Sequence, residues 1–234
     1  MLILAFETSA KAASVALHDG KKLLGESYQN TGLTHSQTLL VMAEDLLRQC
    51  GLSPKDVTAV AVAEGPGSFT GVRIGVAAAK GFAWGAELNC YGVSTLEAMA
   101  KNLGIHQGYV CAAMDARRSQ VYTATFAVEN GEFRRLTPDS AISLDELQMQ
   151  LKDLEKNKLL VGDGAQLCYN NLNPVVSGLV LAPEHLRMQR ASGVALLAWE
   201  QAQAGESPSG LSVTPNYLRL SQAERERQKK ILSE

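Results

Sequence analysis

The N-terminal stretch of the chain reads LILAFETSAKAASVALHDG over residues 2–20, and its plan returns as YVCAAMDARRSQVYTATFAVENG over residues 109–131. Each stretch is an apolar run that ends at an acidic residue, Glu7 or Asp115, followed by a turn and a second run rich in apolar residues. The second run closes with Asp-Gly or Asn-Gly, dipeptides that favour tight hairpin turns. Each stretch therefore predicts a β-hairpin, and together they predict an internal duplication.

The elements expected after each hairpin continue the repeat. In the first half they are a strand at 23–28, a helix at 34–50, a strand at 57–63, a helix at 70–84, a strand at 88–91 and a helix that begins at Ser94 or Thr95. In the second half a capping box at Ser143–Glu146 begins a helix to about residue 154, and a strand at 159–161 runs into Gly162-Asp-Gly-Ala165.

A duplicated β-β-β-α-β-α lobe is the plan of the two-lobed actin, sugar-kinase and Hsp70 ATPase superfold, an α/β fold that holds a nucleotide between its lobes. We expect an N-terminal lobe at 1–104, a C-terminal lobe at 105–220 and a charged tail at 221–234. A late helix at about 190–204 is expected to pack back on the first lobe. In this superfold the phosphates rest on the two hairpins, so the turns after Glu7 and Asp115 are candidate binding elements.

The composition excludes several classes of protein. The 234 residues carry 22 Lys and Arg against 24 Asp and Glu, for a net charge of -2, so no overall charge draws the chain to nucleic acid or a membrane. The four cysteines include no C-x-x-C pair, which disfavours zinc and disulfides. The first residues lack the basic segment of a signal peptide, and no run approaches the ~20 apolar residues of a membrane span. We expect a cytoplasmic protein.

The most informative motif is GPGSFTGVRIG at Gly65–Gly75. It is not a P-loop, because no Lys-Ser/Thr follows at the required spacing. Gly67, Gly71 and Gly75 lie four residues apart and so share one helix face. An interior helical glycine costs roughly 1 kcal/mol relative to alanine, which indicates a close approach to this face. Close backbone packing and an anion at the helix N-terminus both stay open as explanations.

Gly65–Gly75 resembles the signature of the TsaB (YeaZ) family, bacterial proteins of tRNA threonylcarbamoyladenosine biosynthesis. The resemblance extends over the chain through the opening Leu-Ala-Phe-Glu-Thr-Ser, His35–Leu39, Gly92-Val-Ser-Thr, Met114–Arg117 and Pro215–Arg219. It implies a paralogue of TsaD (the Kae1 type), which transfers threonylcarbamoyl from its adenylate to N6 of the adenosine beside the anticodon.

The resemblance also implies what this chain lacks. TsaD-like enzymes bind a metal through His-x-x-x-His, and the corresponding positions here are Thr95 and Met99. A hydroxyl and a thioether do not replace two imidazoles, so we expect no metal site. We also expect no intrinsic cofactor, with ATP or ADP bound only at the interface of a complex.

The nucleotide machinery is incomplete as well. ATP-hydrolysing relatives have a glycine in the first hairpin, where this chain reads Glu7-Thr-Ser9, and Asp115-Ala-Arg-Arg118 again has none. The two arginines could pair with phosphate, or with nearby acids, or lie in a solvated turn. The candidate nucleotide or anion contacts, vestigial or at an interface, are Glu7, Thr8, Ser9, Gly65, Gly67, Ser68, Asp115, Arg117 and Arg118.

A hydrophobic surface is the remaining candidate for function. The helices at 34–50 and 70–84 carry more apolar residues than one sheet contact requires. The residues predicted to meet a partner in a four-helix interface are Leu39, Leu40, Met42, Leu46, Val72, Val76 and Ala79. The resemblance implies a TsaD-type transferase and a TsaE-type ATPase as partners, a homodimer when alone, and tRNA only through the complex.

The leading hypothesis is a non-catalytic subunit that pairs with the TsaD-type transferase and activates it. The alternative is a small actin-fold ATPase or kinase that uses the cleft between the lobes, with Glu7 and Asp115 on magnesium. A protease is disfavoured, because the adjacent His35 and Ser36 project about 100° apart on a helix.

Overall fold

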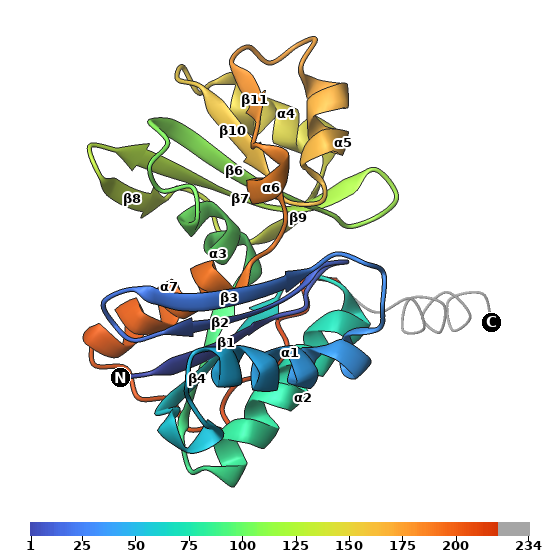
Figure 1. The fold of residues 1–234 in the computed structure, drawn as a ribbon. Coiled ribbons are helices and arrows are strands. Elements are labelled where there is room, and N and C mark those ends of the chain that lie inside the picture. The colour runs from blue at the N-terminus through green and yellow to red at the C-terminus, as the bar shows by residue number, and fades with distance from the viewer. Residues whose placement is uncertain (220–234) are drawn as a thin grey trace, which may run out of the picture.

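The computed structural model describes residues 1–219 and contains two mixed sheets, one above the other in Figure 1. The first has the order β3-β2-β1-β4-β5 and the second the order β11-β10-β6-β7-β8, with β9 paired to β7. In both, the central strand pairs antiparallel with its hairpin partner and parallel with the strand that follows the next helix. The two sheets therefore repeat one topology, as the duplication predicted.

The strands of the first sheet are β1 (Ile3–Glu7), β2 (Ala13–His18), β3 (Leu23–Gln29), β4 (Ala59–Gly65) and β5 (Asn89–Ser94). Those of the second are β6 (Gly108–Asp115), β7 (Gln120–Glu129), β8 (Glu132–Arg135), β9 (Ser140–Ser143), β10 (Lys158–Val161) and β11 (Leu179–Leu181). The helices are α1 (His35–Gln49), α2 (Phe69–Gly85), α3 (Thr95–Lys101), α4 (Leu144–Lys152), α5 (Ala165–Leu172), α6 (Glu184–Arg187) and α7 (Ala191–Gln203), with one 3-10 turn, η1 (Pro54–Asp56).

Alternation along the central strands decides which helices cover each face of the first sheet. Leu4 and Phe6 of β1 point to a core shared with α1 and α2, whereas Ile3 and Ala5 point to a second core shared with α7. Successive strand side chains face opposite ways, and the small residues on the α7 side let this alanine-rich helix lie close. Helix α7, orange-red in Figure 1, thus covers the face opposite α1 and α2.

Helix α3 joins the two lobes. Leu96 and Met99 pack into the core of the second sheet with Phe126, while Ala98 packs with α7. Arg135 of β8 holds the helix from the second lobe through Glu97, at 2.5 Å between Nη2 and Oε2. Within residues 1–219, none of the helices has the length and apolarity that a membrane crossing requires. The predicted charged tail at 221–234 lies outside the described residues.

Candidate ligand site between the lobes

The turn after β1 is buried and tightly bonded. Glu7, Thr8 and Ser9 are at most 1% exposed. Oε1 of Glu7 accepts the Ser9 backbone N–H at 2.6 Å, and Oγ1 of Thr8 donates to the Gly71 carbonyl at 2.8 Å. Burial, with a smaller contribution from the charge of Asp163, raises the pKa of Glu7 to about 7. The carboxyl group is therefore partly protonated near neutral pH.

The spaced glycines allow α2 to approach this turn. A Cβ at Gly71 would run into the Thr8 carbonyl oxygen, one at Gly75 into the Thr8 hydroxyl, and one at Gly67 into the Ser9 backbone. The helix itself begins at Phe69, with the Ser68 hydroxyl accepting from the Gly71 N–H. The glycine pattern thus reflects close backbone packing, while the N-terminus of the same helix borders the space between the lobes.

The turn after β6 has an unusual backbone. Arg117, Arg118 and Ser119 have φ values of 66°, 57° and 56°, a left-handed conformation that non-glycine residues rarely adopt in succession. The Asp115 carboxylate accepts the Arg117 N–H at 2.7 Å. From the C-terminal segment, the Arg219 guanidinium donates to the Ala116 carbonyl. Backbone strain of this kind is concentrated at functional sites.

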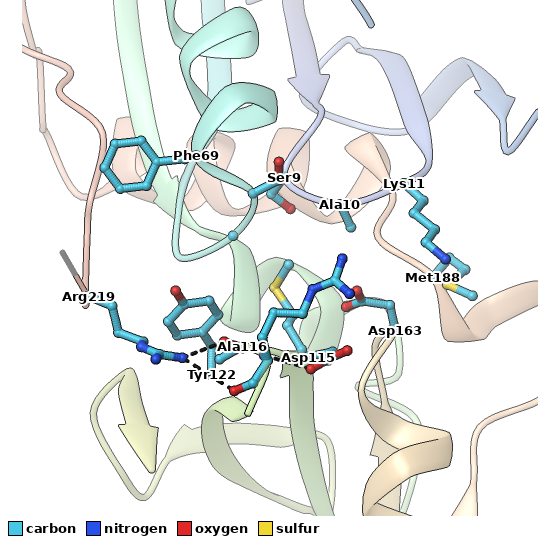
Figure 2. A pocket seen from close by; sticks show the side chains of 14 residues that line it. Ser9, Ala10, Lys11, Phe69, Asp115, Ala116, Tyr122, Asp163, Met188 and Arg219 are labelled. Carbon is cyan, nitrogen blue, oxygen red and sulfur yellow. Dashed lines mark hydrogen bonds between the residues drawn. The ribbon is translucent and has the colours of Figure 1, made fainter. Parts of the chain in front are cut away.

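The two turns enclose a pocket of about 530 Å³ between the lobes (Figure 2). The first lobe contributes Ser9, Ala10, Lys11, Gly67, Ser68 and Phe69 to its lining, the second lobe Met114, Asp115, Ala116, Arg117, Tyr122 and Asp163, and the C-terminal part of the chain Met188 and Arg219. In Figure 2 the Lys11, Asp163 and Arg219 side chains reach toward the space from three different segments. The pocket thus lies between the ends of β1 and β6, the strands that carry the repeated acidic residue.

The structure brings together part of the predicted set. Ser9, Gly67, Ser68, Asp115 and Arg117 line the pocket. The other four predicted contacts do not: Glu7 and Thr8 are buried behind it, Gly65 packs on the Asn216 backbone, and Arg118 lines a separate polar depression beside Ser143 and Asp145.

Several lining residues were missed. Asp163 had a signal, since it lies in the glycine-flanked turn after β10 that repeats the turn after β4. No sequence signal connected Arg219 with the pocket, because its hydrogen-bond partner Ala116 is 103 residues away in the chain.

The charges of the pocket are uneven. Lys11, Arg117 and Arg219 bring three cations, none of which forms an ion pair within the described chain. Of the two acids, Asp163 accepts from Gln189 Nε2 at 3.1 Å, and burial raises its pKa.

Two pairs of residues were considered for metal binding: Thr95 and Met99, at the positions of the TsaD-type histidines, and Glu7 and Asp115, the magnesium ligands of the enzyme alternative. Thr95 and Met99 are buried in the protein interior, and Glu7 does not reach the pocket that Asp115 lines. Across residues 1–219 no group of three or more His, Cys, Asp or Glu side chains is arranged to hold a metal ion. His35, considered for a protease, contacts the Ala10 carbonyl through Nε2 at 2.8 Å.

The structure corrects the predicted partner surface. Leu39, Met42, Leu46, Val72, Val76 and Ala79 are buried in the core between the first sheet and its two helices. Only Leu40 of the seven is exposed, at 56%. Positions 39, 42, 43, 46 and 47 have the spacing of a single helical stripe, and that stripe faces the sheet. The six buried side chains are not available to a partner in this conformation.

Known proteins resemble the chain over nearly its whole length. The family model of TsaD, tRNA N6-adenosine threonylcarbamoyltransferase, matches residues 29–226. The tRNA threonylcarbamoyladenosine biosynthesis protein TsaB of Bacillus subtilis (strain 168) is 33% identical over 96% of both chains. TsaB of Escherichia coli (strain K12) is 35% identical over 94% of this chain and 95% of its own length. The chain belongs to the TsaB (YeaZ) family.

Solved structures agree with this assignment. YeaZ from Pseudomonas aeruginosa superposes with a TM-score of 0.75 at 29% identity, over 93% of the present TsaB-family chain and 99% of its own. Component A of the Acidaminococcus fermentans (R)-2-hydroxyglutaryl-CoA dehydratase shares the fold alone, with a TM-score of 0.52 at 13% identity, over 87% of this chain and 99% of its own. The two-lobed actin-like fold predicted from the sequence is confirmed. This TsaB-family protein has a role in tRNA threonylcarbamoyladenosine biosynthesis.

Proposed function

We propose that this protein is a non-catalytic subunit that pairs with a TsaD-type transferase and activates threonylcarbamoyl transfer to tRNA. The observation that carries the proposal is a set of exposed apolar residues on α1 and α2. These two helices cover the same face of the first sheet (Figure 1). The similarity of the chain to the TsaB proteins of Bacillus subtilis and Escherichia coli and to the TsaD family model supports the proposal. A TsaE-type ATPase is the proposed third component, and tRNA is reached through the assembly.

The proposed interface consists of exposed apolar residues of α1 and α2, in place of the six buried residues that the sequence predicted. We call it the α1–α2 face; it consists of Leu33, Leu40, Val41, Ile74, Ala77, Gly81 and Trp84, all exposed or partly exposed. Trp84 is 72% exposed and Leu40 and Val41 are each 56% exposed. Helices α1 and α2 contact each other; exposed apolar side chains on neighbouring helices are typical of a protein interface, and aromatic residues such as tryptophan often dominate the binding energy.

The composition of this face suits helix-on-helix packing. The exposed side of α2 presents Ala77 and Gly81 between the larger Ile74 and Trp84. Small residues let a second helix approach closely while the larger ones interdigitate with it. A pair of helices from the partner would therefore complete a four-helix arrangement, and a second copy of this chain would do so when the partner is absent.

The interface is tested by Leu40→Glu and Trp84→Glu, which place a charge on the α1–α2 face without touching the core. Met149→Glu is the matched control, because Met149 is 64% exposed on α4 of the second lobe. Burying the exposed part of such a side chain contributes about 1–3 kcal/mol, so titration calorimetry with the TsaD-type transferase should show a loss of affinity of about ten- to a hundredfold. Full affinity in both face variants would contradict the proposed interface.

Activation is tested by reconstituting tRNA modification from the TsaD-type and TsaE-type proteins. Product should form with this chain present and fall strongly when it is left out or replaced by Trp84→Glu. Equal product without the chain would refute the activating role. The enzyme alternative is tested separately with the isolated chain, where ATP turnover would favour an ATPase or kinase.

A further inference from the structure

We propose that Arg73 and Glu87 set the orientation in which a second copy of this chain packs on the α1–α2 face. In this arrangement the two α2 helices lie antiparallel, and each Arg73 binds Glu87 of the second copy. The arrangement rests on the proposed function, because it places its partner on the same face. It adds the direction and the register of the contact, which follow from the residues exposed along α2.

A line of exposed residues runs along α2 and its C-terminal turn. Positions 73, 77, 81, 84 and 87 are three or four residues apart, the spacing of neighbours on one side of a helix. We call this set the α2 stripe; it consists of Arg73, Ala77, Gly81, Trp84 and Glu87, all of them exposed. The stripe begins with a base, ends with an acid and is uncharged between them.

The two charges of the stripe do not serve their own helix. Arg73 lies toward the N-terminal end of α2 and Glu87 directly after its C-cap, which is the opposite of the order that the helix dipole favours. Within residues 1–219 neither side chain forms an ion pair. A second α2 laid antiparallel on the first would bring a base opposite an acid at both ends of the contact, and such complementarity fixes the register of an interface.

The α2 stripe is self-complementary in one register. In a two-fold dimer, a residue that contacts a second residue of the copy is contacted by it in return. Arg73 and Glu87 each lie seven residues from position 80, and Ala77 and Trp84 lie three and four residues from it on opposite sides. A two-fold axis that crosses α2 near position 80 therefore pairs Arg73 with Glu87 and sets Trp84 over Ala77 of the copy.

The centre of this contact has room for the second helix. Gly81 lies beside the axis, and a Cβ there would meet nothing within 4 Å in this chain, so the two backbones can approach closely at this point. Lys80 does not place a charge at the axis, because its Nζ donates to the Val213 carbonyl at 2.9 Å. Trp84, 72% exposed, is the large side chain that fills the space above the small Ala77.

Arg73 is held ready to bind a carboxylate. Its Nε donates to the Tyr217 hydroxyl at 2.7 Å, and its Cζ lies 4.7 Å from the centre of the Phe69 ring. The Phe69 and Tyr217 rings are themselves stacked, with centroids 3.9 Å apart. The guanidinium is thus positioned before a partner arrives, which reduces the side-chain entropy lost on binding. Because Nε is already bonded, the two Nη groups are the donors that remain for Glu87 of the second copy.

Charge reversal tests the pairing in the full chain, with the dimer dissociation constant measured by analytical ultracentrifugation. Arg73→Glu and Glu87→Arg should each weaken self-association about tenfold or more, because each dimer then holds two repulsive pairs. The double variant restores opposite charges and should return to within about threefold of the parent. Arg134→Glu and Glu155→Arg, at exposed positions of the second lobe, are the matched controls and should change nothing. A double variant that is as weak as the single ones, or weaker, overturns the pairing.

Spin labels test the direction of the helices independently of the charges. Thr70 is exposed in the first turn of α2, and Thr70→Cys combined with Cys50→Ser leaves one accessible thiol, since the other cysteines are buried. With the axis at position 80, the labels of an antiparallel dimer are about 30 Å apart along the helices, whereas parallel helices bring them to the same level. A label distance below about 20 Å overturns the antiparallel arrangement.

The variants also separate this arrangement from the proposed function. If Trp84→Glu weakens self-association and the charge reversals do not, the face is correct and the pairing of Arg73 with Glu87 is wrong. A parent chain that stays monomeric at every concentration tested also overturns the arrangement. Affinity for the TsaD-type transferase is measured on its own, so the proposed interface fails only if Leu40→Glu and Trp84→Glu leave that affinity unchanged.

Discussion

Alanine in place of Gly71 is expected to destabilise the protein, although alanine is the better helix former. A Cβ at this position would overlap the Thr8 carbonyl oxygen, a backbone atom that cannot rotate away. The Thr8 hydroxyl also bonds the Gly71 carbonyl at 2.8 Å, so any retreat of α2 weakens that bond. The perturbation therefore affects the packing of the helix on the turn after β1.

The magnitude follows from two opposing contributions. Glycine to alanine inside a helix stabilises by about 1 kcal/mol, whereas an added methyl group in a filled space costs about 1–3 kcal/mol. At Gly71 both apply. Because the overlapped atom is a backbone carbonyl oxygen, the cost falls in the upper part of its range, about 2–3 kcal/mol, and we expect a net loss of about 1–2 kcal/mol. At Gly81 of the same helix a Cβ would meet nothing within 4 Å, so only the gain applies.

Urea denaturation of Gly71→Ala, Gly81→Ala and the parent chain measures both effects in one series. It should be done at low protein concentration without a partner, so that association does not add to stability. The expected order of stability is Gly81→Ala, then the parent, then Gly71→Ala. A Gly71→Ala variant as stable as the parent would refute the close-packing explanation of the glycine pattern.

Three further predictions concern the junction of the lobes. Because burial raises the pKa of Glu7 from 4.5 to about 7, the folded protein holds a proton on Glu7 at pH values where the unfolded chain has released it. The free energy of unfolding should therefore be highest at low pH and fall by on the order of 3 kcal/mol between pH 4.5 and 7. Glu7→Gln should remove this pH dependence, which urea denaturation at several pH values measures. Arg135→Met breaks partly exposed bonds to Glu97 and Asp139 and should lower the free energy of unfolding by about 1–2 kcal/mol; an unchanged value would contradict a structural role. Arg219→Ala should increase hydrogen exchange in the turn after β6, and unchanged exchange there would show that the bond to Ala116 does not hold the turn.

The repeated features of the fold could be predicted because they are local. Hairpin turns, the Ser143 capping box and apolar periodicity each depend on a few adjacent residues, and the structure has a hairpin or helix at each place. Threonine is a common N-cap residue, but Thr34 occupies the N-cap of α1 without a side-chain cap bond, so residue type alone does not establish a cap. The short strand β11 and helix α6, three and four residues long, carry too few residues for a periodic pattern.

The candidate site was predictable only in part, because nine of its fourteen lining residues lie outside the predicted set and reach the pocket through the tertiary fold. The repeated acid and the arginines pointed to the two turns, but Lys11, Tyr122 and Arg219 have no pattern that relates them to each other. For the partner surface the sequence does carry a signal, in the spacing of the apolar residues of α1. The stripe that includes Leu39 and Met42 has the spacing of a sheet-facing side, and Leu40 falls outside it.

Gly81 supports the proposal that a partner helix packs on the α1–α2 face. Gly71 and Gly75 have a reason within the chain, because Thr8 leaves no room for a side chain at either position. Gly81 lies in the same helix, is exposed, and has open space around it, yet it costs about 1 kcal/mol relative to alanine. A close approach by a second molecule accounts for that cost.

Gly81→Leu should therefore fold as stably as the parent or better, while losing at least tenfold in affinity for the TsaD-type transferase. The same substitution at exposed Gly85, one turn further along the helix, measures how far the contact extends. If Gly81→Leu binds with parental affinity, no backbone approaches this position and the four-helix arrangement is wrong, even if Trp84→Glu still weakens binding.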